Sequence, residues 1–202
     1  MRERRYSSTS PDLLAAALFD VAAGAGLESA SVREVAKRAG VSIGAVQHHF
    51  STKDEMFAFA LHDLVDKVLK RLAAIDRHGD PADVLSRMLS QLLPLDEQRY
   101  REAHVMAAFA VRAATSPSLA EIRRTTQFTI RTMLSSVLIG VGTPEAETRV
   151  ALLLATVDGL ALEAVGSPDL YPREYLEHAL DTQIRLTLHS DEAVESSIEL
   201  AS

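Results

Sequence analysis

The succession of helix-start and helix-stop signals constrains the fold of this chain more than any other feature of its sequence. Capping side chains accept hydrogen bonds from the free N–H groups of a first turn, and a proline in that turn leaves no N–H unpaired. Such starts are Ser10-Pro11, Ser31 with Glu34, Ser51-Thr52, Asp80-Pro81, Ser116-Pro117, Thr143-Pro144 and Tyr171-Pro172, and glycines that can end a helix stand at 24, 26, 40, 79, 140, 142 and 166. Between them, apolar residues recur at helical spacing, and no stretch has the pattern of a strand. We therefore predict an all-α fold.

These signals divide the 202 residues into about nine helices. The first three are short, whereas the fourth is long and the later ones are long enough to form a bundle. The predicted helices are 10–24, 31–39, 42–49, 52–77, 80–93, 96–115, 117–139, 143–165 and 171–188. We expect a small N-terminal domain over residues 1–52, a larger helical domain over 53–189 and a disordered tail over 190–202.

Composition excludes several classes of protein. The apolar run at 150–165 is interrupted by Asp158 and Glu163, well short of the ~20 residues that cross a bilayer, so we expect no membrane span. The first residues, MRERRYSSTS, lack the apolar segment of a secretory signal. The chain has no cysteine, which excludes disulfides and thiolate metal sites. A cytoplasmic location fits these observations.

Charge is unevenly distributed along the chain. Residues 1–53 hold seven Lys or Arg and five Asp or Glu, a net charge of +2, while the whole chain has a net charge of −7. A weakly basic end on an acidic body is compatible with a small head that contacts DNA. Arg2, Arg4 and Arg5 could extend that head as an arm along DNA or form a solvated terminus.

The stretch SVREVAKRAGVSIGAVQHHF, residues 31–50, contains two short helices around a glycine. Ser31 can cap the first helix and Glu34 can complete a capping box, while Gly40 permits the left-handed turn that ends it. Ser42 can cap the second helix. Two short helices joined in this way form a helix-turn-helix, whose second helix enters the major groove of DNA.

The second helix has one apolar and one polar face. Val46 and Phe50 stand four residues apart and are expected to face the core. The residues on the opposite face are Ile43, Gly44, Gln47 and His48. The small residues Gly44 and Ala45 would let the helix backbone lie close to its target.

The run AKRAGVSIGAVQHHFSTKDEMF resembles the signature of the TetR family of transcriptional regulators, approximately A-x-x-A-G-V-S-x-G-x-L-Y-x-H-F-x-x-K. The matching residues are Ala36, Ala39, Gly40, Val41, Ser42, Gly44, His49, Phe50 and Lys53. The last part of the chain, from Ala151 onward, is similar to the ligand domain of the choline-responsive BetI-like subgroup. This resemblance implies an N-terminal helix-turn-helix DNA-binding domain and a C-terminal domain that binds a ligand and dimerises.

The resemblance also implies DNA contacts. Gly44, Ala45, Gln47 and His48 would face bases or nearby sugar-phosphate, and Ser31, Ser42, His49 and Lys53 would hold phosphates. Gln47 stands where the family usually has tyrosine, so it could donate to a phosphate or bind adenine through its amide. The alternative for Ser31, Ser42 and Lys53 is that they are caps and solvated charge. Adjacent residues on a helix point ~100° apart, so His48 and His49 are not expected to share a metal ion.

One recognition helix contacts too few base pairs to select an operator, so we expect a homodimer on a palindrome in double-stranded DNA. The expected dimer surface combines a row of small residues with an apolar stripe on the last helix. These residues are Ala151, Ala155 and Gly159 in the row and Leu176, Leu180, Ile184 and Leu188 in the stripe. The alternative is that both rows face the core of their own chain.

A small-molecule effector is expected within the middle helices, and no cofactor or metal is expected. The candidate residues are Met88, Leu92, His104, Met106, Phe109, Arg112, Gln127, Phe128, Met133 and Asp158. The alternative is that these residues belong to the hydrophobic core, which is the commoner role of Met and Phe at helical spacing.

The expected function is that of a repressor that blocks a promoter and is released when its effector shifts the population toward a state with lower DNA affinity. The sequence has none of the H-E-x-x-H, P-loop or G-x-S-x-G motifs of enzymes, so we do not expect an enzyme. A helical interaction module that keeps the helix-turn-helix without binding DNA is the other alternative. It would be insensitive to changes at Gln47, His48 and Lys53.

Overall fold

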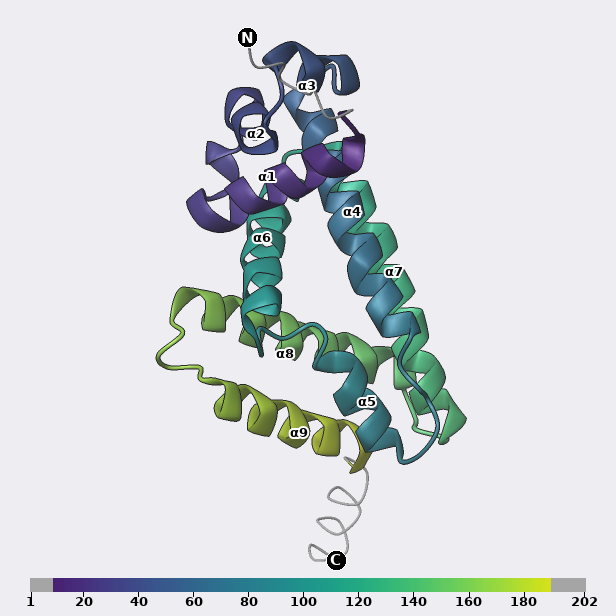
Figure 1. Ribbon diagram of the computed structural model, residues 1–202. Coiled ribbons are helices and arrows are strands. Elements are labelled where there is room, and N and C mark those ends of the chain that lie inside the picture. Colours follow the sequence, from purple (N-terminus) through teal and green to yellow (C-terminus); the bar gives the residue numbers. More distant parts are fainter. Residues whose placement is uncertain (1–8, 190–202) are drawn as a thin grey trace, which may run out of the picture. The chain divides into compact units, whose positions relative to one another are not determined.

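A computed structural model describes residues 9–189, and within that range the chain forms nine α-helices, one 3₁₀ turn and no strand (Figure 1). The prediction of an all-α fold is confirmed. The predicted tail over 190–202 and the arginines at 2, 4 and 5 lie outside the described residues. The elements are α1 (Pro11–Ala25), η1 (Leu27–Ser29), α2 (Val32–Ala39), α3 (Ile43–His49), α4 (Lys53–Ala73), α5 (Pro81–Leu89), α6 (Glu97–Ala113), α7 (Pro117–Gly140), α8 (Ala146–Gly166) and α9 (Arg173–His189).

The described chain divides into two compact units that are not continuous in sequence. Unit 1 contains the residues up to Lys67 together with His104–Thr126, and unit 2 contains Val68–Ala103 together with the residues from Gln127 onward. The helices α4, α6 and α7 therefore each contribute residues to both units. The division differs from the predicted boundary after residue 52, because buried side chains such as Phe57 on α4 and Phe109 on α6 pack together within unit 1.

Unit 1 holds the helix-turn-helix. Ser10 caps α1 by accepting a hydrogen bond from the Leu13 N–H, and Pro11 occupies the first turn. Leu14 and Leu18, one helical turn apart on α1, are fully buried. Their side chains, together with Val35 of α2 and Val46 of α3, are 0% exposed, so each of the three helices buries its apolar side in this unit.

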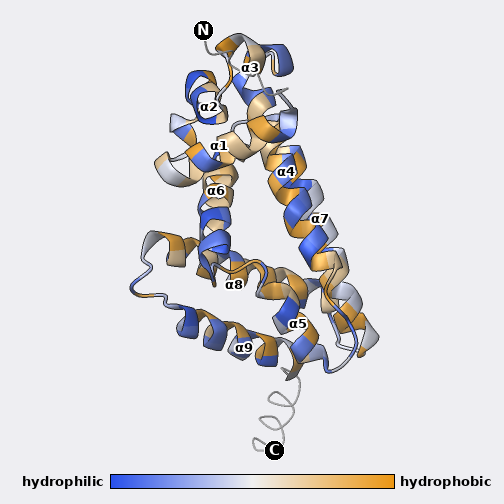
Figure 2. Cartoon of the chain, viewed as in Figure 1, coloured by the Kyte–Doolittle hydropathy of each residue, from blue (hydrophilic) through white to orange (hydrophobic). Residues whose placement is uncertain are grey.

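Unit 2 is built around an aliphatic core. Leu85 and Leu89 of α5, Leu153 of α8 and Leu180 of α9 belong to one buried cluster. The pairs α5 with α9 and α8 with α9 are in contact. Figure 2 shows a hydrophilic and a hydrophobic side on α9, the pattern of a helix that buries one face.

Two predicted helices are shorter than expected. The helix predicted over 52–77 ends at Ala73, because the Asp76 side chain accepts from the His78 N–H at 3.0 Å, and this local bond competes with helix. The helix predicted over 80–93 ends at Leu89. The Leu92 N–H bonds the Leu89 carbonyl three residues back, and proline at 94 disfavours helix in the residue before it.

The predicted start at Thr143-Pro144 is also wrong, since α8 begins at Ala146. Glu145, the residue before the helix, adopts a left-handed conformation with φ 50, and its side chain makes no capping bond. The Thr143 N–H donates to the carbonyl of Leu138, so Thr143 belongs to the turn that closes α7. Among the described residues, no helix is long and apolar enough to cross a membrane.

Candidate nucleic-acid interface

The turn between α2 and α3 has the conformation predicted from its glycine. Gly40 adopts φ 70 and ψ 27, a left-handed conformation that costs an L-residue with a side chain about 1 kcal/mol or more. Ser31 accepts from the Glu34 N–H at 3.2 Å, and Ser42 accepts from the Ala45 N–H at 3.1 Å. Only half of the predicted capping box forms at Ser31, because its own N–H donates to the Ser29 carbonyl at 2.8 Å instead of to Glu34.

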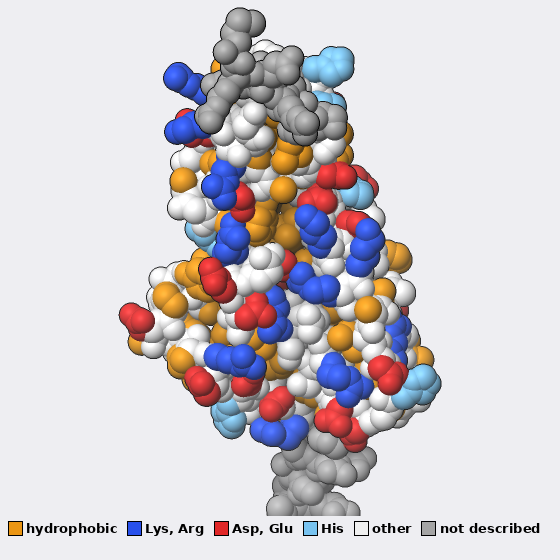
Figure 3. Space-filling view, in the orientation of Figure 1, with side chains coloured by type: hydrophobic (Ala, Val, Ile, Leu, Met, Phe, Trp, Pro, Cys, Tyr) orange, Lys and Arg blue, Asp and Glu red, His pale blue; other side chains and the backbone are white. Residues whose placement is uncertain are grey.

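Two buried side chains fix the rotation of α3. Val46 is 0% exposed and Phe50, directly after the helix, is 7% exposed, as their spacing predicted. The other residues Ile43, Gly44, Gln47 and His48 are exposed, and Ala45 is half-buried. Figure 3 shows histidine side chains at the surface of the unit that carries α3. The helix thus presents a short, mostly polar face with little side-chain bulk at its centre.

His49 and Lys53 have contacts within unit 1. The Nε2 atom of His49 lies 3.2 Å from the carbonyl oxygen of Thr9, which joins α3 to the segment before α1. The Lys53 ammonium lies 5.0 Å from the centre of the Phe57 ring. His49 therefore connects α3 to that segment, while Lys53, half-buried at the start of α4, lies over a ring of its own helix.

The basic residues of α2 are partly paired with acids. A guanidinium nitrogen of Arg38 lies 2.7 Å from Asp20 of α1, and Lys37 lies 3.8 Å from Glu34. The Arg38 bond joins α2 to α1 at an exposed site. Because these cations are paired with carboxylates, affinity for nucleic acid has to come from short-range contacts as well as from charge.

Sequence profiles of known families match both parts of the chain. The profile of bacterial regulatory proteins of the tetR family matches residues 13–59, which include the helix-turn-helix described above. The profile of the C-terminal domain of BetI-type transcriptional repressors matches residues 81–189. The chain belongs to the TetR family of transcriptional regulators. Both resemblances predicted from the sequence are confirmed, and the family is one of regulators rather than enzymes.

Individual relatives agree with this assignment. The HTH-type transcriptional regulator PksA of Bacillus subtilis is 33% identical over 148 residues, which cover 71% of this chain and 72% of PksA. A transcriptional regulator from Rhodococcus sp. Rha1 has a crystal structure with 79% identity and a TM-score of 0.88, covering 90% of this chain and 97% of that one. A regulator from Saccharomonospora viridis in complex with choline is 16% identical with a TM-score of 0.79, covering 87% of this chain and 95% of that one, and shares the fold.

Four of the residues predicted to line an effector pocket lie in unit 1 of this TetR-family chain, beside the helix-turn-helix. Arg112 donates to Asp54 at 2.9 Å and to Glu28 at 3.2 Å, and its guanidinium lies 4.9 Å from the centre of the Phe57 ring. The hydrogen bond to Asp54 raises the pKa of Arg112, and burial opposes that rise. Arg112 therefore joins α6 to η1 and to the start of α4.

The other three residues in unit 1 also have structural surroundings. Phe109 is 2% exposed and meets the Phe57 ring edge-on, with ring centres 6.0 Å apart. The Nδ1 atom of His104 lies 3.2 Å from the carbonyl oxygen of Ala23, at the end of α1. Met106 is half-buried. His104, Phe109 and Arg112 thus contact other elements of unit 1, and their role in an effector pocket stays a prediction.

The remaining six predicted pocket residues lie in unit 2. Met88 is 0% exposed within the aliphatic core, so it is a packing residue. Phe128 is 72% exposed, and Asp158 is exposed on α8, so neither lines an enclosed site. The half-buried members of the set are Leu92, Gln127 and Met133.

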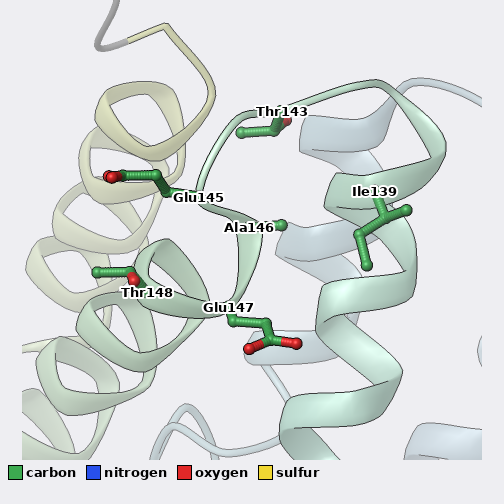
Figure 4. A pocket seen from close by; sticks show the side chains of 6 residues that line it. All are labelled: Ile139, Thr143, Glu145, Ala146, Glu147 and Thr148. Atoms are coloured by element: carbon green, nitrogen blue, oxygen red, sulfur yellow. The ribbon is translucent and has the colours of Figure 1, made fainter.

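An open hollow of 380 Å³ lies at the start of α8 and contains none of the predicted residues (Figure 4). It is lined by Ile139, Thr143, Glu145, Ala146, Glu147 and Thr148. In Figure 4 the side chains of Glu145 and Thr148 point to the opposite side from Ile139. The hollow therefore lacks the converging polar groups of a ligand site.

Sequence reasoning missed an ion pair in unit 2 whose carboxylate is buried and whose guanidinium is half-buried. Arg71 of α4 donates through its two terminal nitrogens to the two oxygens of Glu102 on α6, at 2.9 and 2.5 Å. Gln98 also donates to Glu102, at 2.9 Å. The bonds to Glu102 raise the pKa of Arg71 against the effect of burial. Nothing in the spacing of Arg71 and Glu102 in the sequence predicts this contact.

The apolar stripe predicted for a dimer interface faces the core of its own chain. Leu176, Leu180 and Ile184 are 1–2% exposed and belong to the buried cluster of unit 2, and Leu188 packs against it. Because α9 packs on α5 and α8, its apolar side is already covered within one subunit. These four residues therefore pack in the core of their own chain, and their role in a dimer interface stays a prediction.

The predicted row of small residues is accessible. Ala155 and Gly159 of α8 are exposed and Ala151 is half-buried. Leu152 and Leu162, on the same helix, are 61% and 57% exposed. The outer face of α8 therefore combines small residues with exposed leucines, which is a composition suited to close contact with another helix.

Proposed function

We propose that this chain is a transcriptional repressor that binds a palindromic operator as a homodimer and is released by a small molecule. The observation that carries the proposal is the rotation of α3, in which buried Val46 and Phe50 direct Gly44, Gln47 and His48 outward. In a helix-turn-helix the second helix enters the major groove with its exposed face toward the bases. The description of the matching C-terminal profile as that of a repressor supports repression over activation.

Within this proposal, Ser31, Ser42 and Lys53 surround the outward face of α3 and contact phosphates. His49 contributes to the same surface indirectly, because its contact with the Thr9 carbonyl oxygen connects α3 to the segment before α1. A role in DNA binding supports a cytoplasmic location. The effector enters unit 2, where Leu92, Gln127 and Met133 remain the candidates of the predicted set. The choline complex of the Saccharomonospora viridis regulator supports a small-molecule effector in a protein of this fold.

The effector acts only through its differential affinity for two states of the dimer. Because α4 and α6 contribute residues to both units, a change in unit 2 that moves either helix also moves residues of unit 1. On α6, those residues include Arg112, whose ion pairs reach η1 and the start of α4.

The function is tested by measuring binding of the purified chain to tiled fragments of the DNA upstream of its own gene, at two salt concentrations. We expect one palindromic fragment to bind tightly, with an affinity that falls steeply as salt rises. The variant Gln47→Ala/His48→Ala should lose at least about tenfold in affinity, since each lost base contact costs about 1–3 kcal/mol. Both side chains are exposed, so the fold should be retained.

The matched control is His178→Ala, which removes an exposed side chain from α9 and should bind DNA as the unaltered chain does. Fragments that all bind equally, with no effect of the double variant, would favour a helical interaction module instead. In that case the helix-turn-helix would not read DNA.

The dimer is tested at the outer face of α8. Leu152→Glu changes a side chain that is 61% exposed, so the subunit should fold, but the dimer would bury an unpaired charge. Such a burial costs about 3–5 kcal/mol, so we expect the dissociation constant to rise about 100-fold or more in sedimentation velocity. Val111→Glu, at a 78% exposed position of α6, is the control and should leave the dimer intact. Equal dissociation constants for both variants would show that the dimer interface does not include the outer face of α8.

A further inference from the structure

We propose that Ile43 and Gln47 read two neighbouring A·T pairs in each operator half-site, Ile43 through a thymine methyl group and Gln47 through an adenine edge. The inference rests on the proposed function, since it assigns base identities to the outward face of α3.

Ile43 is a large apolar side chain that unit 1 does not bury. It is the first residue of α3 and is 46% exposed, whereas Val46, three residues later, is 0% exposed. On the major-groove edges of the bases, the apolar group is the C5-methyl of thymine; the other edges offer hydrogen-bond donors and acceptors. Contact with that methyl would bury the exposed part of Ile43 without leaving a polar base atom unpaired.

Gln47 stands four residues after Ile43 and therefore on the same side of the helix. Its amide carries a donor and an acceptor, and adenine presents the complementary pair, an acceptor at N7 and a donor at N6. Guanine presents two acceptors on this edge, which would leave the Gln47 oxygen without a donor. Hence the amide of Gln47 favours adenine over guanine.

Gly44 makes room for both contacts. It is exposed, and among the described residues a side chain placed there would meet the Ser42 hydroxyl at 3.9 Å, an ordinary van der Waals contact. The absence of a side chain lets the α3 backbone approach the base edges closely, so that side chains as short as Ile and Gln can reach them. Four residues of helix span about 6 Å, close to two base-pair steps of about 3.4 Å. The two A·T pairs should therefore lie within about two steps of each other.

The test uses the palindrome that the full chain enriches from random-sequence DNA. Each thymine of a half-site is replaced singly by deoxyuridine, which lacks the methyl, and each adenine by 7-deazaadenine, which lacks N7. For the unaltered chain we expect one thymine whose replacement costs about fourfold in affinity, the value of one buried methyl. We expect one adenine nearby whose replacement costs about fivefold or more.

The variants Ile43→Ala and Gln47→Ala show whether those losses arise from these residues. Ile43→Ala should be insensitive to the deoxyuridine that weakens the unaltered chain, yet remain sensitive to 7-deazaadenine, and Gln47→Ala should show the reverse. Both positions are exposed, so circular dichroism spectra should match that of the unaltered chain. If both variants lose as much affinity as the unaltered chain on each base replacement in the enriched palindrome, the base assignment is overturned, while the proposed function stands. A selection that enriches no sequence would overturn the proposed function and the assignment with it.

Discussion

Replacing Phe109 by alanine is expected to lower the free energy of unfolding by about 3–5 kcal/mol, the cost of removing a large aromatic side chain from a core. Phe109 is 2% exposed and its ring meets Phe57 edge-on, so the variant would leave a cavity against a second buried ring. Arg112 lies on that same Phe57 ring. The loss should therefore extend to the contacts that hold α6 against the start of α4.

The measurement is urea unfolding followed by far-ultraviolet circular dichroism, because the chain has no tryptophan for fluorescence. Val111→Ala is the control on the same helix: its side chain is 78% exposed, and its change should stay within about 0.5 kcal/mol. Operator affinity of Phe109→Ala should also fall at temperatures where unit 1 begins to unfold. A change below about 1 kcal/mol for Phe109→Ala would show that Phe109 is not part of a packed core.

Replacing Arg71 by alanine is expected to cost a similar amount, about 3–5 kcal/mol, for a different reason. Glu102 is 5% exposed, and without Arg71 its carboxylate would remain buried with the amide of Gln98 as its described side-chain partner. An uncompensated buried charge is destabilising, whereas removing both charges is nearly neutral. The double variant Arg71→Met/Glu102→Leu should thus recover most of the stability lost in Arg71→Ala.

Urea unfolding of the two single variants and the double variant gives the coupling free energy between Arg71 and Glu102. A matched control is Arg173→Ala, which breaks an exposed ion pair with Glu177 on α9 and should cost less than about 1 kcal/mol. If the double variant were as unstable as Arg71→Ala, the loss would come from packing of the Arg71 stem rather than from the unpaired carboxylate.

The helix-turn-helix could be predicted from the sequence because its determinants are local. Ser31, Gly40 and Ser42 act on backbone groups within four residues of themselves, and the structure gives each the predicted cap or turn. The rotation of α3 follows from Val46 and Phe50, which are four residues apart on one helix. Such short-range patterns require no knowledge of the rest of the fold.

The pocket and dimer residues depended on long-range packing, which periodicity does not determine. The stripe of Leu176, Leu180 and Ile184 correctly marks a buried face of α9, but a buried face can pack on its own subunit as well as on a second one. In the same way, Phe109 and Arg112 have the residue types of a pocket, yet their partners Phe57, Asp54 and Glu28 lie far from them in sequence.

The division of α6 between the two units affects the order in which the protein can form during synthesis. The DNA-binding head needs residues from His104–Thr126 to cover Phe57, so it cannot be completed when its own three helices have left the ribosome. Residues 68–103, which belong to unit 2, must be made first, at about 5–20 residues per second. The DNA-binding unit of a nascent chain can therefore fold completely only after part of unit 2 has been synthesised. A chimera that takes this unit from a relative would have to include the part of α6 that belongs to unit 1, along with α1 to α4.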